Sequence, residues 1–159
     1  MNISAASLAI LGGALALAGG LGGAAIGMAM AGYSGVATLA IDPKHLKSVI
    51  ILAALPMSRV FYGFIILIFV LTTVLPKIYL MPEPGGSGFA VAACGLISAA
   101  AFSFSGIYQG HVCSAGISAL IKTKGRILTN SIMLAVFVEL LAVLGLVFTI
   151  LSLSLLDLM

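Results

Sequence analysis

The sequence predicts an all-α membrane protein whose four transmembrane helices form two tandem antiparallel hairpins. The chain has 159 residues, of which 62% are hydrophobic and 7% are charged, and its mean hydropathy is +1.32. Soluble domains carry about 25% charged residues. Four apolar segments each exceed the roughly 20 residues that cross a bilayer. The polar segments between them are short, so consecutive helices are expected to be antiparallel, with no separate water-soluble domain.

Each helix is predicted from an apolar segment and the polar break beside it. The first segment has no basic residues before it and runs beyond the length of a signal peptide, so we expect a mature helix. The second lies between a charged break and Pro76, the third follows a Pro/Gly-rich break, and the fourth follows a basic break. The expected helices span residues 5–40, 48–75, 87–121 and 127–155, and the expected hairpins span residues 1–80 and 81–159.

Basic residues predict the orientation of the helices in the cell membrane. The first break contains Lys44 and Lys47, the third contains three basic residues between 122 and 126, and the second contains Lys77 alone. Lys and Arg concentrate in cytoplasmic loops. We therefore expect loops 41–47 and 122–126 in the cytoplasm, with both termini and the second break on the other side.

The two halves of the chain resemble one hairpin repeated. Gly35-Val-Ala-Thr-Leu-Ala is similar to Gly116-Ile-Ser-Ala-Leu-Ile, 81 residues later. The same offset carries Glu139 back to Met57 or Ser58, so the first half lacks the acid. The sequence therefore predicts parallel repeats in which one copy has the carboxylate.

The first helix is unusually rich in glycine. Gly19, Gly23 and Gly27 form consecutive steps of four residues, and alanines lie between them. Small residues at this spacing let membrane helices approach closely. Such a smooth face predicts tight packing against other copies of the chain, and the alternative is packing within one chain.

Glu139 is the strongest candidate for a functional residue. It lies in the apolar segment 131–150, with no obvious access to water. A carboxylate at the centre of a membrane helix costs about 2.5–3.5 kcal/mol on insertion scales, so it is by default a functional-site hypothesis. The alternative is a structural hydrogen bond between helices.

Other polar residues are predicted at the same depth as Glu139. At 1.5 Å per residue, Ser58, Arg59 and Gln109 also lie roughly 16–18 Å from the cytoplasmic ends of their helices, and Tyr62 lies one turn deeper. Oxygen atoms around a carboxylate suit a hard cation, and the same groups can hydrogen-bond a neutral carboxyl, which burial favours. The arrangement predicts a carrier of one cation at a time.

These residues carry a resemblance that covers nearly the whole chain. It resembles the c or K proteolipid of V-type rotary ATPases in its bacterial double-hairpin form. The motifs are Ile26-Gly-Met-Ala-Met-Ala-Gly-Tyr33, Leu55-Pro-x-Ser58 with Tyr62-Gly63, Phe104-Ser-Gly-Ile-Tyr-Gln109-Gly110, and Val138-Glu139 followed by Leu144-Gly145.

The resemblance implies a homo-oligomeric ring that turns in lipid against a stator, coupled to ATP hydrolysis or synthesis in a soluble head. Glu139 matches the essential carboxylate. The implied partners are other copies of the chain, a stator membrane subunit with an arginine, and a central-stalk subunit at loops 41–47 and 122–126. It implies no nucleic acid, no cofactor beyond the transported H⁺ or Na⁺, and no enzyme activity of the subunit by itself.

The resemblance also implies a set of ion-binding residues. In sodium-carrying relatives the ion is held by groups matching Glu139, Gln109, the Ser58 hydroxyl and the Leu55 carbonyl, and Tyr62 matches a tyrosine that hydrogen-bonds the glutamate. Arg59 departs from the family pattern, which has a glutamine there. A fixed cation at this position would repel Na⁺ and could pair with Glu139, which favours H⁺.

Two questions stay open at this point. If Arg59 points towards a headgroup, the ring lumen or a neighbouring copy, Na⁺ remains an alternative, with Glu139, Gln109 and Ser58 as metal ligands. A small four-helix cation-coupled transporter and a membrane scaffold are alternatives to the rotor-ring assignment. The sequence shows no catalytic triad, metal cluster or phosphate-binding loop, so no enzyme is predicted.

Overall fold

In the computed structural model, residues 4–82 and 85–159 are described, and their regular structure is entirely helical. Within these described residues, four helical spans are long and apolar enough to cross a membrane, which confirms the predicted fold class. Three are single helices, α1 (Ala5–Ile41), α5 (Ser87–Ala119) and α6 (Leu128–Leu155). The remaining span comprises η1 (Pro43–His45), α2 (Leu46–Ala54), η2 (Leu55–Met57), α3 (Ser58–Phe69), η3 (Val70–Val74) and α4 (Leu75–Leu80).

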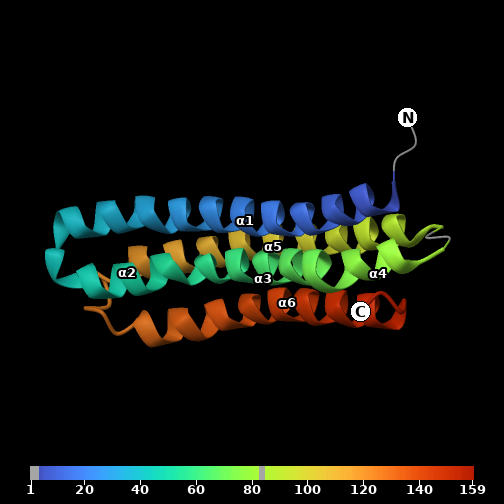
Figure 1. Ribbon diagram of the computed structural model, residues 1–159. Helices are drawn as coiled ribbons and strands as arrows, with labels where there is room; N and C mark the ends of the chain where they lie inside the picture. Colours follow the sequence, from blue (N-terminus) through green and yellow to red (C-terminus); the bar gives the residue numbers. More distant parts are fainter. Residues whose placement is uncertain (1–3, 83–84) are drawn as a thin grey trace.

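The spans form an elongated antiparallel bundle (Figure 1). α1 begins and α6 ends at the same end of the bundle, on the right in Figure 1, and the connections from α1 to α2 and from α5 to α6 lie at the opposite end. α1 packs most extensively against α5, and α3 also packs against α1. α1 and α5 run in the same direction, as expected for parallel repeats.

The glycines of α1 pack against α5 of the same chain. A Cβ atom on Gly12 would lie 2.5 Å from the Val91 carbonyl oxygen, and one on Gly23 would lie 2.6 Å from the Ser103 carbonyl oxygen. Contacts this close to backbone leave room for glycine alone. The expectation that this face packs against other copies is therefore corrected, because these glycines serve packing within one chain.

Prolines reshape the second span at two places. Pro56 lies in the 3₁₀ turn η2, where proline removes a backbone donor and tightens the helix locally. Before Pro76 the chain forms the π-helical turn η3, and the helix then continues as α4 to Leu80. The predicted end of this helix at residue 75 was wrong, because the π turn accommodates the proline at the start of α4.

Candidate ion-binding site

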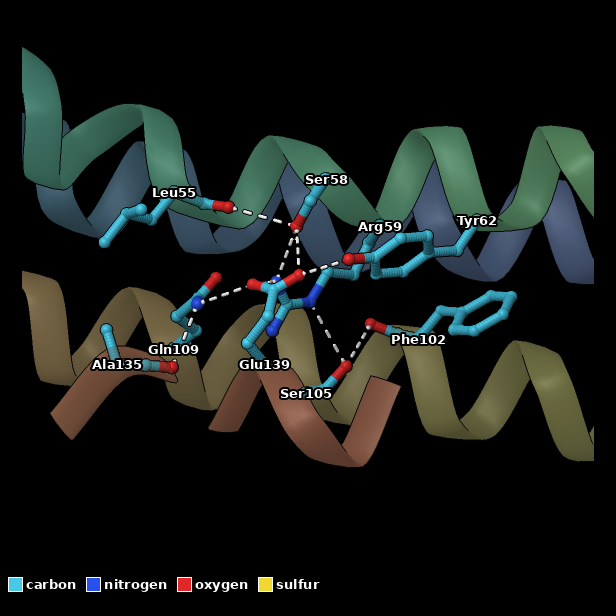
Figure 2. Close-up of polar contacts among 9 residues, drawn as sticks. All are labelled: Leu55, Ser58, Arg59, Tyr62, Phe102, Ser105, Gln109, Ala135 and Glu139. Carbon is cyan, nitrogen blue, oxygen red and sulfur yellow. Dashed lines mark hydrogen bonds and ion pairs between the residues drawn. The ribbon is translucent and has the colours of Figure 1, made fainter. Parts of the chain in front are cut away.

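Glu139 lies at mid-length on α6, and its side chain points towards α3 and α5 (Figure 2). Its Oε1 atom accepts hydrogen bonds from Ser58 Oγ at 2.8 Å and from Tyr62 Oη at 2.6 Å. Its Oε2 atom accepts one from Gln109 Nε2 at 2.9 Å. Arg59 Nη1 forms an ion pair and hydrogen bond with the same Oε2 atom. Both carboxylate oxygens are therefore held by donors from two other helices.

α3 supplies three of these donors within one turn. Ser58 and Tyr62 are four residues apart and so lie on one face of the helix. The Ser58 hydroxyl lies 3.3 Å from the Leu55 carbonyl oxygen and closer to Glu139. A hydroxyl has one proton to donate, so the shorter distance favours the carboxylate. The 3₁₀ turn at Pro56 brings the Leu55 carbonyl to the edge of the site.

Arg59 lies inside the bundle and points into the site. It is fully buried, with 0% exposure. Besides Glu139, its Nη1 atom donates to Ser58 Oγ at 2.7 Å and its Nε atom donates to Ser105 Oγ at 3.3 Å. Its Nη2 atom has no hydrogen-bond partner among the described residues. The backbone at Arg59 fits against α1 because Gly20 has no side chain, since a Cβ there would meet the Arg59 carbonyl oxygen.

Gln109 reaches the site from α5 and is 1% exposed. Its Nε2 atom donates to Glu139 and, at 3.0 Å, to the Ala135 carbonyl oxygen one turn earlier on α6. Its Oε1 atom is buried and has no hydrogen-bond partner among the described residues. The Gln109 amide therefore joins α5 to α6 by two hydrogen bonds, and its oxygen atom can still accept another.

The structure brings together all the side chains that the sequence places at this depth, Ser58, Arg59, Tyr62, Gln109 and Glu139 (Figure 2). Two participants were missed, the Ser105 hydroxyl and the Ala135 carbonyl. Ser105 could have been found from its spacing, because it lies four residues before Gln109 on the same helix face. The backbone carbonyl gave no sequence signal.

The donor set suits a proton better than a metal cation. Glu139 Oε2 and Ser58 Oγ already accept hydrogen bonds from the guanidinium group of Arg59. Hard cations such as Ca²⁺ take at least six oxygen ligands, and a cation bound at Glu139 would lie beside a fixed positive charge. A proton needs one carboxylate oxygen and no coordination shell.

The fold and site define a polytopic membrane protein with one carboxylate held at mid-depth by polar groups from two other helices. The family described as the C subunit of ATP synthase matches residues 11–70 and 86–152, and the chain belongs to this family. The two matched segments cover α1 with most of the second span, and then α5 with most of α6. The family membership confirms the resemblance seen in the sequence.

Two curated relatives of this chain are both named subunit K. The chain is 33% identical over 134 residues to the A-type ATP synthase subunit K of Methanocaldococcus jannaschii, covering 82% of this chain and 54% of that protein. It is 32% identical over 127 residues to the V-type sodium ATPase subunit K of Enterococcus hirae, covering 79% of this chain and 76% of that protein. The chain thus spans about half the length of the first relative.

Proposed function

We propose that this chain is a rotor-ring subunit of a V/A-type rotary ATPase and that Glu139 carries a proton across the membrane. The observation that carries the proposal is the mid-depth carboxylate held by Ser58, Arg59, Tyr62 and Gln109. Family membership and the relatives' names support the rotor-ring assignment. They also argue against a small four-helix transporter and an inert scaffold.

The position of Glu139 suits exchange with a partner outside the chain. Its side chain is 21% exposed, and the neighbouring residues Phe137, Leu140 and Leu141 are among the exposed large hydrophobic residues. The carboxylate thus lies at the edge of the bundle, beside a surface suited to lipid or another membrane subunit. Reversible protonation there would let one copy of the chain accept a proton from one side and release it to the other.

The choice of H⁺ rests on Arg59. The Enterococcus hirae relative is named a sodium ATPase subunit, and Na⁺ is therefore the rival ion, with Glu139, Gln109 and Ser58 as its ligands. The pairing of Arg59 with Glu139 places a positive charge where that ion would bind. We therefore favour proton transport with no metal cofactor.

The proposed partners follow from the ends of the bundle. The two connections at one end contain the basic residues of loops 41–47 and 122–126. These loops lie close together, because a Cβ atom added to Gly125 would lie 3.5 Å from the ring of His45. We propose that this end is cytoplasmic and contacts the central stalk, so that both termini lie on the other side. Other copies of the chain would complete the ring, and a stator subunit with an arginine would face Glu139.

Carbodiimide labelling of the purified ring tests this proposal, because the reagent attacks protonated carboxyl groups that are accessible from lipid. We expect Glu139 to be labelled in a pH-dependent manner that Na⁺ does not alter, and the Glu139→Gln ring to show no labelling. Protection by Na⁺ would overturn the choice of ion. A well-folded ring whose Glu139 never reacts at any pH would overturn the carrier role itself.

A further inference from the structure

A cationic pocket lies in the connection between α5 and α6, at one end of the bundle (Figure 1). Its volume is about 430 Å³, within the roughly 300–1,000 Å³ of small-molecule pockets. Three cationic side chains, two other polar side chains and one apolar side chain line it: Lys122, Thr123, Lys124, Arg126, Ile127 and Asn130. None of these lining residues is acidic, so the pocket suits an anionic ligand.

The connection that carries the cationic residues is a hydrogen-bonded turn. The N–H of Gly125 donates to the Leu120 carbonyl oxygen at 2.9 Å, and the N–H of Leu128 donates to the Gly125 carbonyl oxygen at 3.3 Å. Lys124 and Gly125 have φ angles of 51° and 82°, the left-handed conformation in which many helices end. The turn therefore holds the three cationic residues on a defined backbone at the start of α6.

An apolar groove adjoins this pocket and extends into the bundle between α5 and α6. Its volume is about 340 Å³, and it shares Ile127 with the cationic pocket. Its deepest lining residues, Val112 and Leu134, lie seven residues further along their helices than its outermost ones, or roughly 10 Å at 1.5 Å per residue. Mostly small side chains line the rest of the groove: Ala115, Gly116, Ala119 and Ser131.

We propose that the pocket and the groove together bind one anionic phospholipid. Its headgroup phosphate would lie among Lys122, Lys124 and Arg126, and one acyl chain would lie along the groove between α5 and α6. Basic pockets between membrane helices suit anionic lipid headgroups. The inference requires that the chain spans a membrane, and it does not depend on the ion that Glu139 carries.

Two other occupants fit the pocket and groove less well. A second copy of this chain would bring little negative charge, because Asp42 is the only acidic residue in the two connections at this end. Asp42 already accepts a hydrogen bond from the Lys44 N–H and lies 3.7 Å from His45 Nε2. An acidic soluble subunit could meet the cationic residues, but the groove lies between membrane-length helices. A molecule with an anionic head and an apolar chain matches both parts.

Native mass spectrometry of the purified full-length protein in detergent tests the headgroup site, with phosphatidylglycerol and phosphatidylcholine of identical acyl chains as probes. We expect one phosphatidylglycerol per chain to bind more tightly than phosphatidylcholine. One Lys or Arg near an anionic lipid surface strengthens binding by about fivefold, so Arg126→Gln should weaken phosphatidylglycerol binding by about that factor. Lys44→Gln is the matched control, because it removes a charge at the same end but outside the pocket. Equal weakening by both variants would show that binding follows overall charge, and would overturn the inference.

The groove is tested by a variant that keeps the charge. Ala115→Leu fills the groove and should weaken phosphatidylglycerol binding at unchanged helicity. Inorganic phosphate has no acyl chain and should not displace the lipid at equal concentration. Displacement by phosphate, together with full lipid binding by Ala115→Leu, would assign a site for a free anion and overturn the lipid assignment. Equal binding of the two phospholipids would also overturn it, and would leave the cationic residues to an acidic soluble partner. None of these measurements involves transport, so their outcome is independent of the proposed function.

Discussion

Gly23 and Gly22 are adjacent in α1 but face different surroundings, and this difference predicts the effect of adding one methyl group. A Cβ on Gly23 would lie 2.6–2.7 Å from the carbonyl oxygens of Ser103 and Phe102, whereas a Cβ on Gly22 would meet none of the described residues within 4 Å. Backbone atoms cannot move aside as a flexible side chain can. In Gly23→Ala, α1 and α5 must therefore separate by roughly 1 Å, since carbon atoms pack well at about 3.5–4.0 Å.

Separating α1 from α5 should lower the free energy of unfolding, because it weakens the contacts that depend on the close approach of the two helices. Overpacking costs about 1–3 kcal/mol. The Ser103 hydroxyl, which donates to the Gly19 carbonyl at 3.0 Å, lies beside the altered position. Interhelical hydrogen bonds in membranes contribute about 0.6 kcal/mol on average. We expect Gly23→Ala to lower the free energy of unfolding by about 2–3 kcal/mol in total.

Reversible unfolding of the detergent-solubilised protein by a denaturing detergent measures this difference, with helicity as the signal. Gly22→Ala is the matched control and should unfold at nearly the wild-type detergent fraction. The measurement is made on single chains dissociated from the ring, so that contacts between copies do not contribute. Equal stability of the two variants would refute the close packing of α1 on α5.

Three further predictions concern the site and its surroundings. Glu139→Gln should assemble and keep its helicity but abolish ATP-driven proton uptake in reconstituted vesicles, and normal uptake would exclude Glu139 as the carrier. Tyr62→Phe, which removes the 2.6 Å hydrogen bond to Glu139, should keep transport but change its pH dependence, and an identical pH profile would show that the bond is unimportant. Ser98→Ala removes the buried 2.8 Å bond to Thr149 between α5 and α6 and should lower stability by about 0.6 kcal/mol without changing transport. A loss of transport with unchanged stability would contradict this structural role.

Helix number, direction and depth could be predicted from the sequence because each depends on distance along the chain. A rise of 1.5 Å per residue places Ser58, Gln109 and Glu139 at one level, and the structure joins them by hydrogen bonds. The offset between the two repeats also related single residues of the site. It carried Glu139 back to Met57 or Ser58, and Ser58 is one of the residues that donate to it.

The partner of the glycine face could not be predicted in the same way. Small residues spaced four positions apart show that another backbone approaches closely, but they do not identify that backbone. The structure places α5 there, with Gly12 opposite Gly95 and Gly27 opposite Gly110. Both helices have small residues at matching depths because the two halves of the chain resemble each other. Duplication therefore supplied a partner for this face within one chain.

The direction of Arg59 depends on rotation about the helix axis and on a local break. Residues one position apart on a helix do not face the same way, so an ideal helix would direct Arg59 away from Ser58, although it places Arg59 and Tyr62, three positions apart, as neighbours. Its long side chain nevertheless returns to Glu139, because Ser105 holds its Nε atom and the glycine face of α1 leaves room beside its backbone. These contacts come from helices distant in sequence. A residue whose charge is evident from the sequence thus acquires its effect on the ion from the packing of α1 and α5 around it.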